Sequence, residues 1–231
     1  IFKSVNGGNN WTKLTGGLPS AWSGRTTLEL YKGNQNLVYA SISNDFSYVG
    51  YYKSSNAGLN WTNVNTSVPI GTQGWYNNGH YVKANDPNAI LVGTINVEKS
   101  VNGGTTFTTK SDWSAWNEGA TPAGEPEGPS DFVHADVHYY ESNPKDPNKI
   151  YIAADGGLYR SNDFGETYYS CNGGFVTSQF YAAFVNSYQD SLFSLGGLQD
   201  NRAAFYQGSD SWYKTFYGDG MSCAINSQND N

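Results

Sequence analysis

Charged residues are scarce in this sequence, and lysine, glutamate, leucine and methionine are used sparingly. Only 14% of the residues are charged, the formal net charge is −7, and there is a single methionine. No basic patch alternates with aromatic residues, which argues against nucleic acid as a partner. No apolar run approaches the roughly 18 residues that a membrane-spanning helix needs. The composition therefore argues against a nucleic-acid-binding protein and against a membrane span.

Cysteine is also rare, since only Cys171 and Cys223 are present. These two residues could form a disulfide in an oxidising compartment, or they could remain two free thiols, and the sequence leaves both open. No cysteine-based metal motif occurs, and neither does a phosphate-binding glycine loop.

Aromatic residues and glycine are abundant in this sequence. Aromatics make up 16% of the chain and there are 27 glycines among 231 residues. Together with abundant Asn, Ser and Thr, this composition favours strands and turns over helices. No amphipathic helical pattern stands out. We therefore predict an all-β fold, in a chain long enough for one large domain.

One eight-residue pattern occurs four times, at 4–11, 54–61, 100–107 and 161–168. It reads Ser, any residue, Asn or Asp, any residue, Gly, any residue, Thr or Asn, and an aromatic. Asn or Asp favours a turn, Gly supplies a positive φ, and the aromatic opens the next strand and packs in the core. The positions that define the pattern are Ser4, Asn6, Gly8, Trp11, Ser54, Asn56, Gly58, Trp61, Ser100, Asn102, Gly104, Phe107, Ser161, Asp163, Gly165 and Tyr168.

The segments around each copy repeat as well. Three short β-rich runs precede the pattern and a fourth strand follows it, which predicts four-stranded antiparallel blades of a β-propeller. We expect half a blade at 1–15, blades at about 24–66, 77–110, 133–172 and 178–217, and the start of another at 218–231. The chain is thus expected to be a single propeller segment whose ring is completed by further blades of a longer polypeptide. Residues 111–130 are predicted to be an insertion on one rim.

The repeated frame resembles the Asp-box, or BNR repeat, of sialidases, sortilin-type receptors and xyloglucan-hydrolysing glycosidases. The second half is most similar to large bacterial secreted proteins of the sortilin-like, glycosidase-like type. The residues that carry this similarity are 134–138, 155–161, 179–181, 196–201 and 218–221. The resemblance implies a propeller fold and an extracellular or cell-surface location. It specifies function poorly, because the same turn serves enzymes, receptors and adhesins.

Two groups of polar residues are candidate sites. His134, Asp136 and His138 alternate along an expected strand, 134–141, where they would share one face. They could bind a divalent transition metal, act as an acid/base cluster, or form a polar ladder in a wet channel. Asp155, Asp200 and Asp219 lie at predicted strand ends, where they are either catalytic carboxylates or ordinary turn residues. Asp136, Asp200 and Asp219 are the catalytic candidates, and a divalent metal is the one cofactor that the sequence suggests.

Four tryptophans are candidate sugar-stacking residues: Trp75, Trp113, Trp116 and Trp212. A sialidase would need three converging arginines, and Arg25, Arg160 and Arg202 are the only ones present. We expect a propeller module that binds a glycan or a protein at its rim. The alternatives are a xyloglucanase-like glycoside hydrolase with carboxylates at the propeller axis, and a structural unit of a surface assembly.

Overall fold

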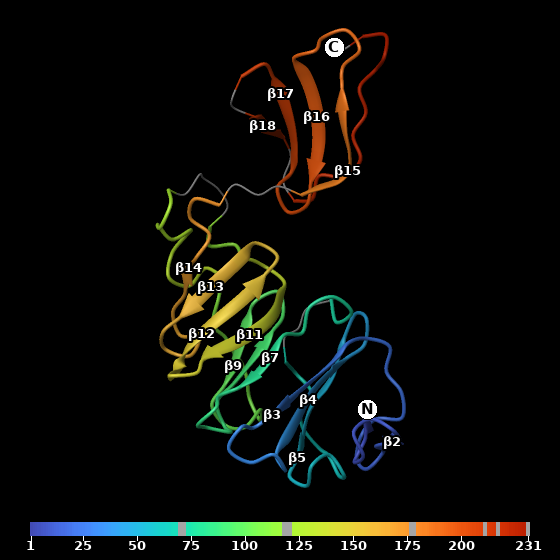
Figure 1. The fold of residues 1–231 in the computed structure, drawn as a ribbon, viewed down its shortest axis with the longest axis vertical. Helices are drawn as coiled ribbons and strands as arrows, with labels where there is room; N and C mark the ends of the chain where they lie inside the picture. The colour runs from blue at the N-terminus through green and yellow to red at the C-terminus, as the bar shows by residue number, and fades with distance from the viewer. Residues whose placement is uncertain (69–72, 117–121, 176–178, 210–211, 216–217, 230–231) are drawn as a thin grey trace. The chain divides into compact units, whose positions relative to one another are not determined.

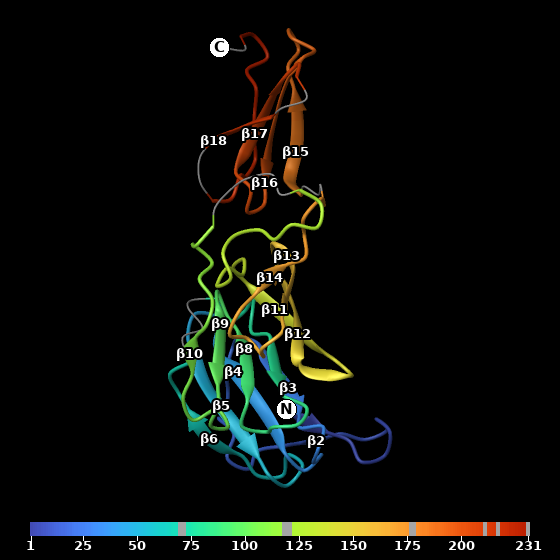
Figure 2. The ribbon, with the colours of Figure 1, turned by 90° about the vertical axis from the view of Figure 1, so that its left-hand side faces the viewer.

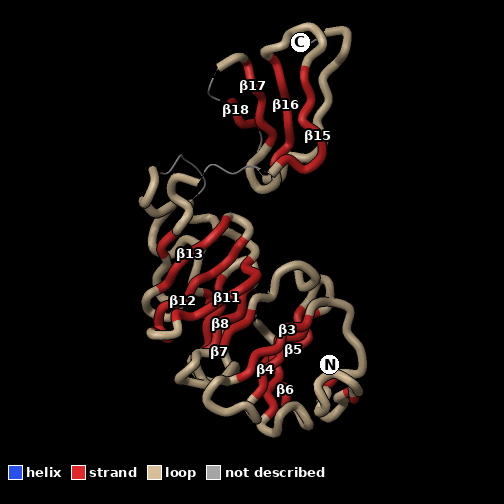
Figure 3. Tube along the Cα trace, viewed as in Figure 1, coloured by secondary structure: helices blue, strands red, loops and turns tan. Residues whose placement is uncertain are grey.

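The computed structural model describes residues 1–231 except 69–72, 117–121, 176–178, 210–211, 216–217 and 230–231. All regular elements of the described residues are β-strands (Figure 3), which confirms the all-β prediction. Within this part of the chain, no helix is long and apolar enough to cross a membrane. The contacts divide the chain into two compact units, Ile1–Gly174 and Phe175–Asn231.

The first unit contains a short hairpin and three antiparallel sheets of four strands among its described residues (Figure 1). In each sheet the strands pair in chain order, so each sheet is a meander. The hairpin is β1 (Phe2–Lys3) with β2 (Thr12–Lys13). The sheets are β3 (Thr26–Leu30), β4 (Val38–Ser43), β5 (Tyr48–Ser54) and β6 (Thr62–Asn65); β7 (His80–Val82), β8 (Ile90–Gly93), β9 (Val97–Ser100) and β10 (Thr108–Thr109); and β11 (Val137–Asn143), β12 (Asp146–Ala154), β13 (Gly157–Ser161) and β14 (Tyr169–Ser170).

The second unit is built around one further four-stranded antiparallel meander. Its strands are β15 (Phe180–Asn186), β16 (Phe193–Leu198), β17 (Ala203–Gln207) and β18 (Trp212–Thr215). Phe205 stacks on Tyr213 at a centroid distance of 5.2 Å, which joins the last two strands through a cross-strand aromatic pair. The prediction of four-stranded antiparallel blades is therefore confirmed in both units.

The repeated pattern forms the same turn in all four copies. The Ser Oγ accepts a hydrogen bond from the Gly N–H four residues later, for example Gly104 to Ser100 at 3.0 Å. The Asn or Asp Oδ1 accepts one from the backbone four residues later, for example Thr106 to Asn102 at 2.9 Å. The residue before the Gly also has a positive φ, including Ala57 at 58° and Phe164 at 56°. The turn thus satisfies its own backbone donors through two side chains.

A second bond ties each turn of the three full blades in the first unit to another turn of the same sheet. The N–H of the residue before the Gly donates to a carbonyl in the turn between the first two strands or at the start of the second strand. These bonds run from Ala57 to Asn36 at 2.8 Å, from Gly103 to Asn88 at 3.0 Å and from Phe164 to Asn148 at 2.8 Å. Because the two turns lie at the same end of the meander, the bond fixes the third strand beside the second.

The aromatic residue that ends the pattern is buried in two copies and exposed in one. Trp61 and Tyr168 are buried, as predicted, and Phe107 packs partly buried against Tyr51. Trp11 was predicted to be in the core, but 62% of it is exposed, so that prediction is wrong. Its indole Nε1 donates to Gly8 O at 2.9 Å, which keeps the ring over its own turn. Trp11 belongs to a hairpin of only two strands among the described residues, so no four-stranded sheet is there to cover its ring.

The sheets of the first unit pack face to face, and their first strands are neighbours. β7 contacts both β3 and β11, so the first strands of three consecutive sheets lie side by side (Figure 1 and Figure 2). One apolar core, which includes Leu91, Ile150 and Phe164, lies between the second and third sheets, and another, which includes Tyr39 and Val92, lies between the first and second. This arrangement of radial meanders is that of propeller blades.

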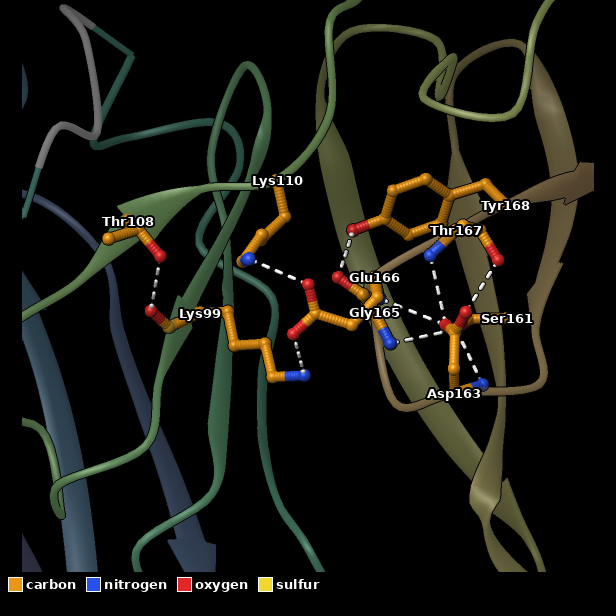
Figure 4. Close-up of polar contacts among 9 residues, drawn as sticks. All are labelled: Lys99, Thr108, Lys110, Ser161, Asp163, Gly165, Glu166, Thr167 and Tyr168. Carbon is orange, nitrogen blue, oxygen red and sulfur yellow. Dashed lines mark hydrogen bonds and ion pairs between the residues drawn. The ribbon is translucent and has the colours of Figure 1, made fainter.

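The repeated turns also contact the preceding sheet. Glu166, in the turn of the third sheet, accepts bonds from Lys99 at 2.7 Å and from Lys110 at 2.6 Å, both in the second sheet (Figure 4). Lys3 Nζ likewise donates to Ala57 O at 2.8 Å, in the turn of the first sheet. Lys3 and Lys99 both stand directly before the Ser of the pattern. In these two copies, the residue before the turn reaches the turn of the next sheet.

Candidate functional site

The polar side chains singled out in 134–138 lie at the end of the sheets opposite the repeated turns. In a meander, successive turns alternate between the two ends. The repeated turns follow the third strand, so the start of the first strand and the turn between the second and third strands lie at the other end. The segment 73–79 before β7, the segment 134–136 before β11 and the turn at 155–156 all lie there. We call this end of the first unit the loop end.

Three side chains at the loop end form a hydrogen-bonded chain between two sheets. His138 Nε2 lies 2.6 Å from Asp155 Oδ1, and Tyr76 Oη donates to Asp155 Oδ2 at 2.8 Å. Because a carboxylate only accepts, His138 carries its proton on Nε2. The Tyr76 ring meets the His138 ring edge-on at a centroid distance of 4.9 Å. Asp155 is therefore held by two donors, one from each sheet.

Asp136 lies beside this chain and is buried, with 9% of the residue exposed. Burial raises the pKa of its carboxyl, a hydrogen bond from Asn77 Nδ2 at 2.9 Å lowers it, and the charge of Asp155 raises it again. The net effect is a pKa above the usual value. A carboxyl with a raised pKa near a second carboxylate has the chemistry of a general acid.

The backbone at the loop end is strained at two residues of the segments that meet there. Asp136 has a φ of 65° and Asn78 a φ of 102°, values that Asn and Asp tolerate better than most residues. Asn78 Oδ1 accepts a hydrogen bond from Ser41 Oγ at 2.7 Å, which fixes that conformation from the first sheet. Positive φ values in sparsely populated regions often accompany functional sites.

The prediction that His134, Asp136 and His138 share one strand face is wrong. β11 begins only at Val137, and the positive φ of Asp136 breaks the alternation of side chains. His134 Nδ1 donates to the carbonyl of the next residue at 3.1 Å, and His138 pairs with Asp155. Among the described residues, no group of three or more His, Cys, Asp or Glu side chains could hold a metal ion. The structure thus gives no support to the metal site predicted at these residues.

Asp200 and Asp219 lie in the second unit and serve turn geometry. The backbone N–H of Asp200 donates to Asp219 Oδ1 at 2.8 Å. Asp200 has a φ of 56°, and Arg202 forms an isolated bridge with Asp219. A carboxylate that accepts a hydrogen bond from the backbone N–H of another turn is typical of Asp in turns.

The four candidate tryptophans differ in exposure. Trp75 is 54% exposed and lies at the loop end, with its ring 5.2 Å from that of Tyr76. Trp113 is 48% exposed at the start of the 111–130 segment. Trp116 packs on Phe132 at 5.5 Å at the edge of the core, and Trp212 of the second unit packs on Phe184 at the same distance. Trp75 is the exposed tryptophan that lies beside the polar cluster.

Residues 122–130 of the 111–130 segment contact the third sheet, whereas residues 111–113 bond to Asn96 and Val97 of the second. Glu127 Oε2 accepts hydrogen bonds from Ser170 Oγ at 2.9 Å and Asn172 Nδ2 at 3.0 Å. Tyr169 Oη donates to Gly124 O at 2.9 Å. The segment therefore covers the outer edge of β14, where an unpaired strand edge would otherwise be exposed. Residues 117–121 of the predicted insertion lie outside the described residues.

Cys171 and Cys223 are both free thiols and belong to different units. Each Sγ lies near a backbone carbonyl two residues earlier, that of Tyr169 and that of Met221 respectively.

The sequence did not identify Tyr76 or Asn77 as residues of this site. Tyr76 and Asn77 lie between sheets, and nothing in their local pattern marks them as partners of residues 59 to 79 positions away. The one local signal was Asn77-Asn78-Gly79, a turn-forming run directly before a strand.

Comparisons with known proteins give fold-level likenesses. No family model matches the sequence, and no curated protein matches it. A solved GH74 enzyme of Niastella koreensis has 19% identity and a TM-score of 0.47, covering 81% of this chain and 29% of its own. The GH74 xyloglucanase of Xanthomonas campestris has 14% identity and a TM-score of 0.49, covering 84% and 32%. The extracellular domain of a putative hybrid two-component system of B. thetaiotaomicron has 12% identity and a TM-score of 0.45, covering 85% and 25%.

The class of protein follows from the sheets themselves. Meanders of four antiparallel strands, with neighbouring first strands and apolar cores between their faces, are β-propeller blades. The chain spans about a third of the length of the GH74 enzymes that it resembles.

Proposed function

We propose that this chain is an extracellular or cell-surface β-propeller module of the Asp-box type that binds a glycan at the loop end of its first unit. The observation that carries the proposal is the exposed Trp75 ring beside the Tyr76–Asp155–His138 chain. Sugar rings stack on exposed aromatic faces, and their hydroxyls need fixed donors and acceptors nearby. The described residues of the loop end supply both, from the second and third sheets.

The Asp-box assignment is supported by the four turns with their shared Ser and Asn or Asp hydrogen bonds. Those turns lie at the opposite end from Trp75, so they would stabilise the blades without contacting the ligand. Loops at the ends of a propeller strand are free to vary while the sheets hold them in place. A binding role at the loop end is therefore compatible with a structural role for the repeated turns.

Binding of the chain to a panel of soluble polysaccharides, measured by calorimetry or affinity electrophoresis, tests the proposal. We expect Trp75→Ala to weaken binding about tenfold or more, since roughly 1.4 kcal/mol corresponds to a factor of ten. Trp11→Ala is the control, because Trp11 is 62% exposed but belongs to a repeated turn, at the end of the sheets opposite Trp75. Equal binding by both variants and the original chain would refute a site at Trp75.

A glycoside hydrolase is the second candidate, and Asp136 is the observation that favours it. Its raised pKa and its interaction with the Asp155 charge match the acid and carboxylate that glycosidases use. Release of reducing ends from xyloglucan and related glucans would test this activity. Turnover that disappears in Asp136→Asn and in Asp155→Asn would support an enzyme, and binding without turnover would leave the binding module.

A further inference from the structure

Arg25 brings a positively charged group to the same loop end from the first sheet. Its backbone N–H donates to Gly74 O at 2.8 Å, and its guanidinium Nη1 donates to Tyr76 O at 2.7 Å. Arg25 therefore binds the peptide groups on both sides of Trp75. Ser43 Oγ, which is fully buried, lies 3.0 Å from both Arg25 O and Gly74 O and holds the two segments together.

The guanidinium is exposed and only partly used. Nη1 binds a carbonyl, which leaves the other N–H groups of the fork for a ligand. Among the described residues, the ion pairs are those of Lys32, Lys99, Lys110 and His138, so no carboxylate of these residues neutralises Arg25. A fixed guanidinium without an acidic partner is suited to bind a carboxylate in a bidentate manner.

We propose that the preferred ligand of this site is a glycan that contains uronic acid, with a sugar ring on Trp75 and its carboxylate on Arg25. The proposal rests on the proposed function and assigns a chemical class to its ligand. Arg25 is bonded to the backbone on both sides of Trp75, which keeps its guanidinium near that residue. The Tyr76 hydroxyl and His138 Nε2 both donate to Asp155, which offsets the charge of that carboxylate.

The net charge of −7 works against an anionic ligand only at long range. Charges separated by more than about 10 Å are largely screened at ordinary ionic strength. A charge-assisted bond of Arg with a carboxylate acts at contact distance, where screening is small. Recognition of the carboxylate is therefore decided by the local guanidinium.

The experiment compares acidic polysaccharides with their carboxyl-reduced, neutral forms. Polygalacturonate, alginate and a glucuronate-containing glycan are each titrated into the 231-residue chain before and after carboxyl reduction. We expect at least one acidic polymer to bind about tenfold or more tightly than its reduced form. Arg25→Gln should abolish this difference, and Arg25→Lys should retain part of it because a charge remains. Lys145→Gln, which removes an exposed charge in the β11–β12 turn, should leave the difference intact.

The outcomes separate the two proposals. If neutral polymers bind through Trp75 as tightly as acidic ones, or if Arg25→Gln keeps the full difference, the uronic-acid inference is overturned and the glycan site stands. If no polymer binds, or Trp75→Ala changes nothing, the proposed function itself is overturned. Thermal melting of Arg25→Gln gives the check on folding, since the Arg25 side chain is exposed and its backbone bond to Gly74 does not depend on the side chain.

Discussion

His138 Nε2 lies 2.6 Å from Asp155 Oδ1, in a pair that joins the first strand of the third sheet to the turn between its second and third strands. The pair fixes Asp155 beside Asp136, whose own position is set by the left-handed backbone before β11. Two carboxylates that are far apart in the sequence are thereby brought to one end of the unit. The arrangement makes the charge of one acid depend on the state of the other.

The pKa of Asp136 should respond in opposite directions to two substitutions. Asp155→Asn removes a negative charge, so the pKa of Asp136 should fall toward its usual value. Asn77→Ser removes the amide donor to the ionised carboxylate, so that pKa should rise. Carboxyl 13C NMR titration of both variants measures the shifts. Unchanged or same-signed shifts would contradict this account of the cluster.

Two glycines of the repeated turn should differ in their tolerance of alanine. Gly8 and Gly104 both have a φ of 90°, so alanine pays the same backbone cost of about 1–2 kcal/mol at each. An added Cβ at Gly104 would clash with the Tyr51 ring, whereas at Gly8 the nearest atom is 3.8 Å away. Gly104→Ala should therefore lower the free energy of unfolding more than Gly8→Ala. Denaturant unfolding measures the two values, and equal losses would show that packing against Tyr51 is unimportant.

Asp163 should tolerate Asn but not Ala. Its carboxylate accepts bonds from Glu166 N and Thr167 N, each at 2.9 Å, and from the Thr167 hydroxyl at 2.6 Å. Ala removes these acceptors at a cost of roughly 1–3 kcal/mol, whereas Asn keeps Oδ1, as in the other three copies. Thermal melts of the two variants test this order, and an equally stable Ala variant would argue against the turn bonds.

The charge of Asp163 adds a pH dependence. Burial raises the pKa of this carboxyl, but hydrogen bonds from Thr167, Ser161 and Glu166 outweigh burial and lower it to about 2. Because the folded pKa is below the unfolded value, this stabilisation is full above the unfolded pKa of about 4 and is lost as the pH falls toward 2. The free energy of unfolding of Asp163→Asn should therefore fall less than that of the original chain as the pH is lowered from about 4 to about 2. An identical acid profile for the variant would contradict the lowered pKa.

Glu98 should have the opposite pH dependence. It is buried in β9 with the Thr109 hydroxyl 3.1 Å and 3.0 Å from its two oxygens. Burial raises its pKa to about 7, while the Thr109 bond lowers it. Since the folded pKa is above the unfolded value of about 4.3, its contribution is full below that pH and is lost as the pH rises through 7. The free energy of unfolding of Glu98→Gln, minus that of the original chain, should therefore be larger at pH 8 than at pH 4.

A pH series of denaturant unfolding curves measures the effect of Glu98. Burial also raises the pKa of Glu29 to about 7. Glu29 remains in the Glu98→Gln variant, so the stability of that variant should still fall with rising pH, but less steeply than that of the original chain. A difference in stability between the two proteins that does not vary with pH would show that Glu98 titrates normally.

Local patterns predicted the parts of the fold that depend on local bonds. The Ser, Asn or Asp, and Gly of the repeated frame make hydrogen bonds within five residues, so the turn is written into a short stretch such as 100–107. The strands around it follow from β-rich runs between turns. The burial of the aromatic residue that ends the pattern could not be predicted locally. Trp61 is buried because a four-stranded sheet packs against it, and Trp11 has no such sheet among the described residues.

The sequence alone determined the all-β class, the four-stranded blades and the position of the repeated turns, because these rest on short-range backbone bonding and on alternation along a strand. Only the tertiary structure decided which polar residues meet. β11 begins at Val137, three residues later than expected, so His134 and Asp136 lie off the strand face. Contacts across sheets brought Tyr76 and Arg25 to the site from distant positions. Such contacts depend on how the blades pack, which no local pattern encodes.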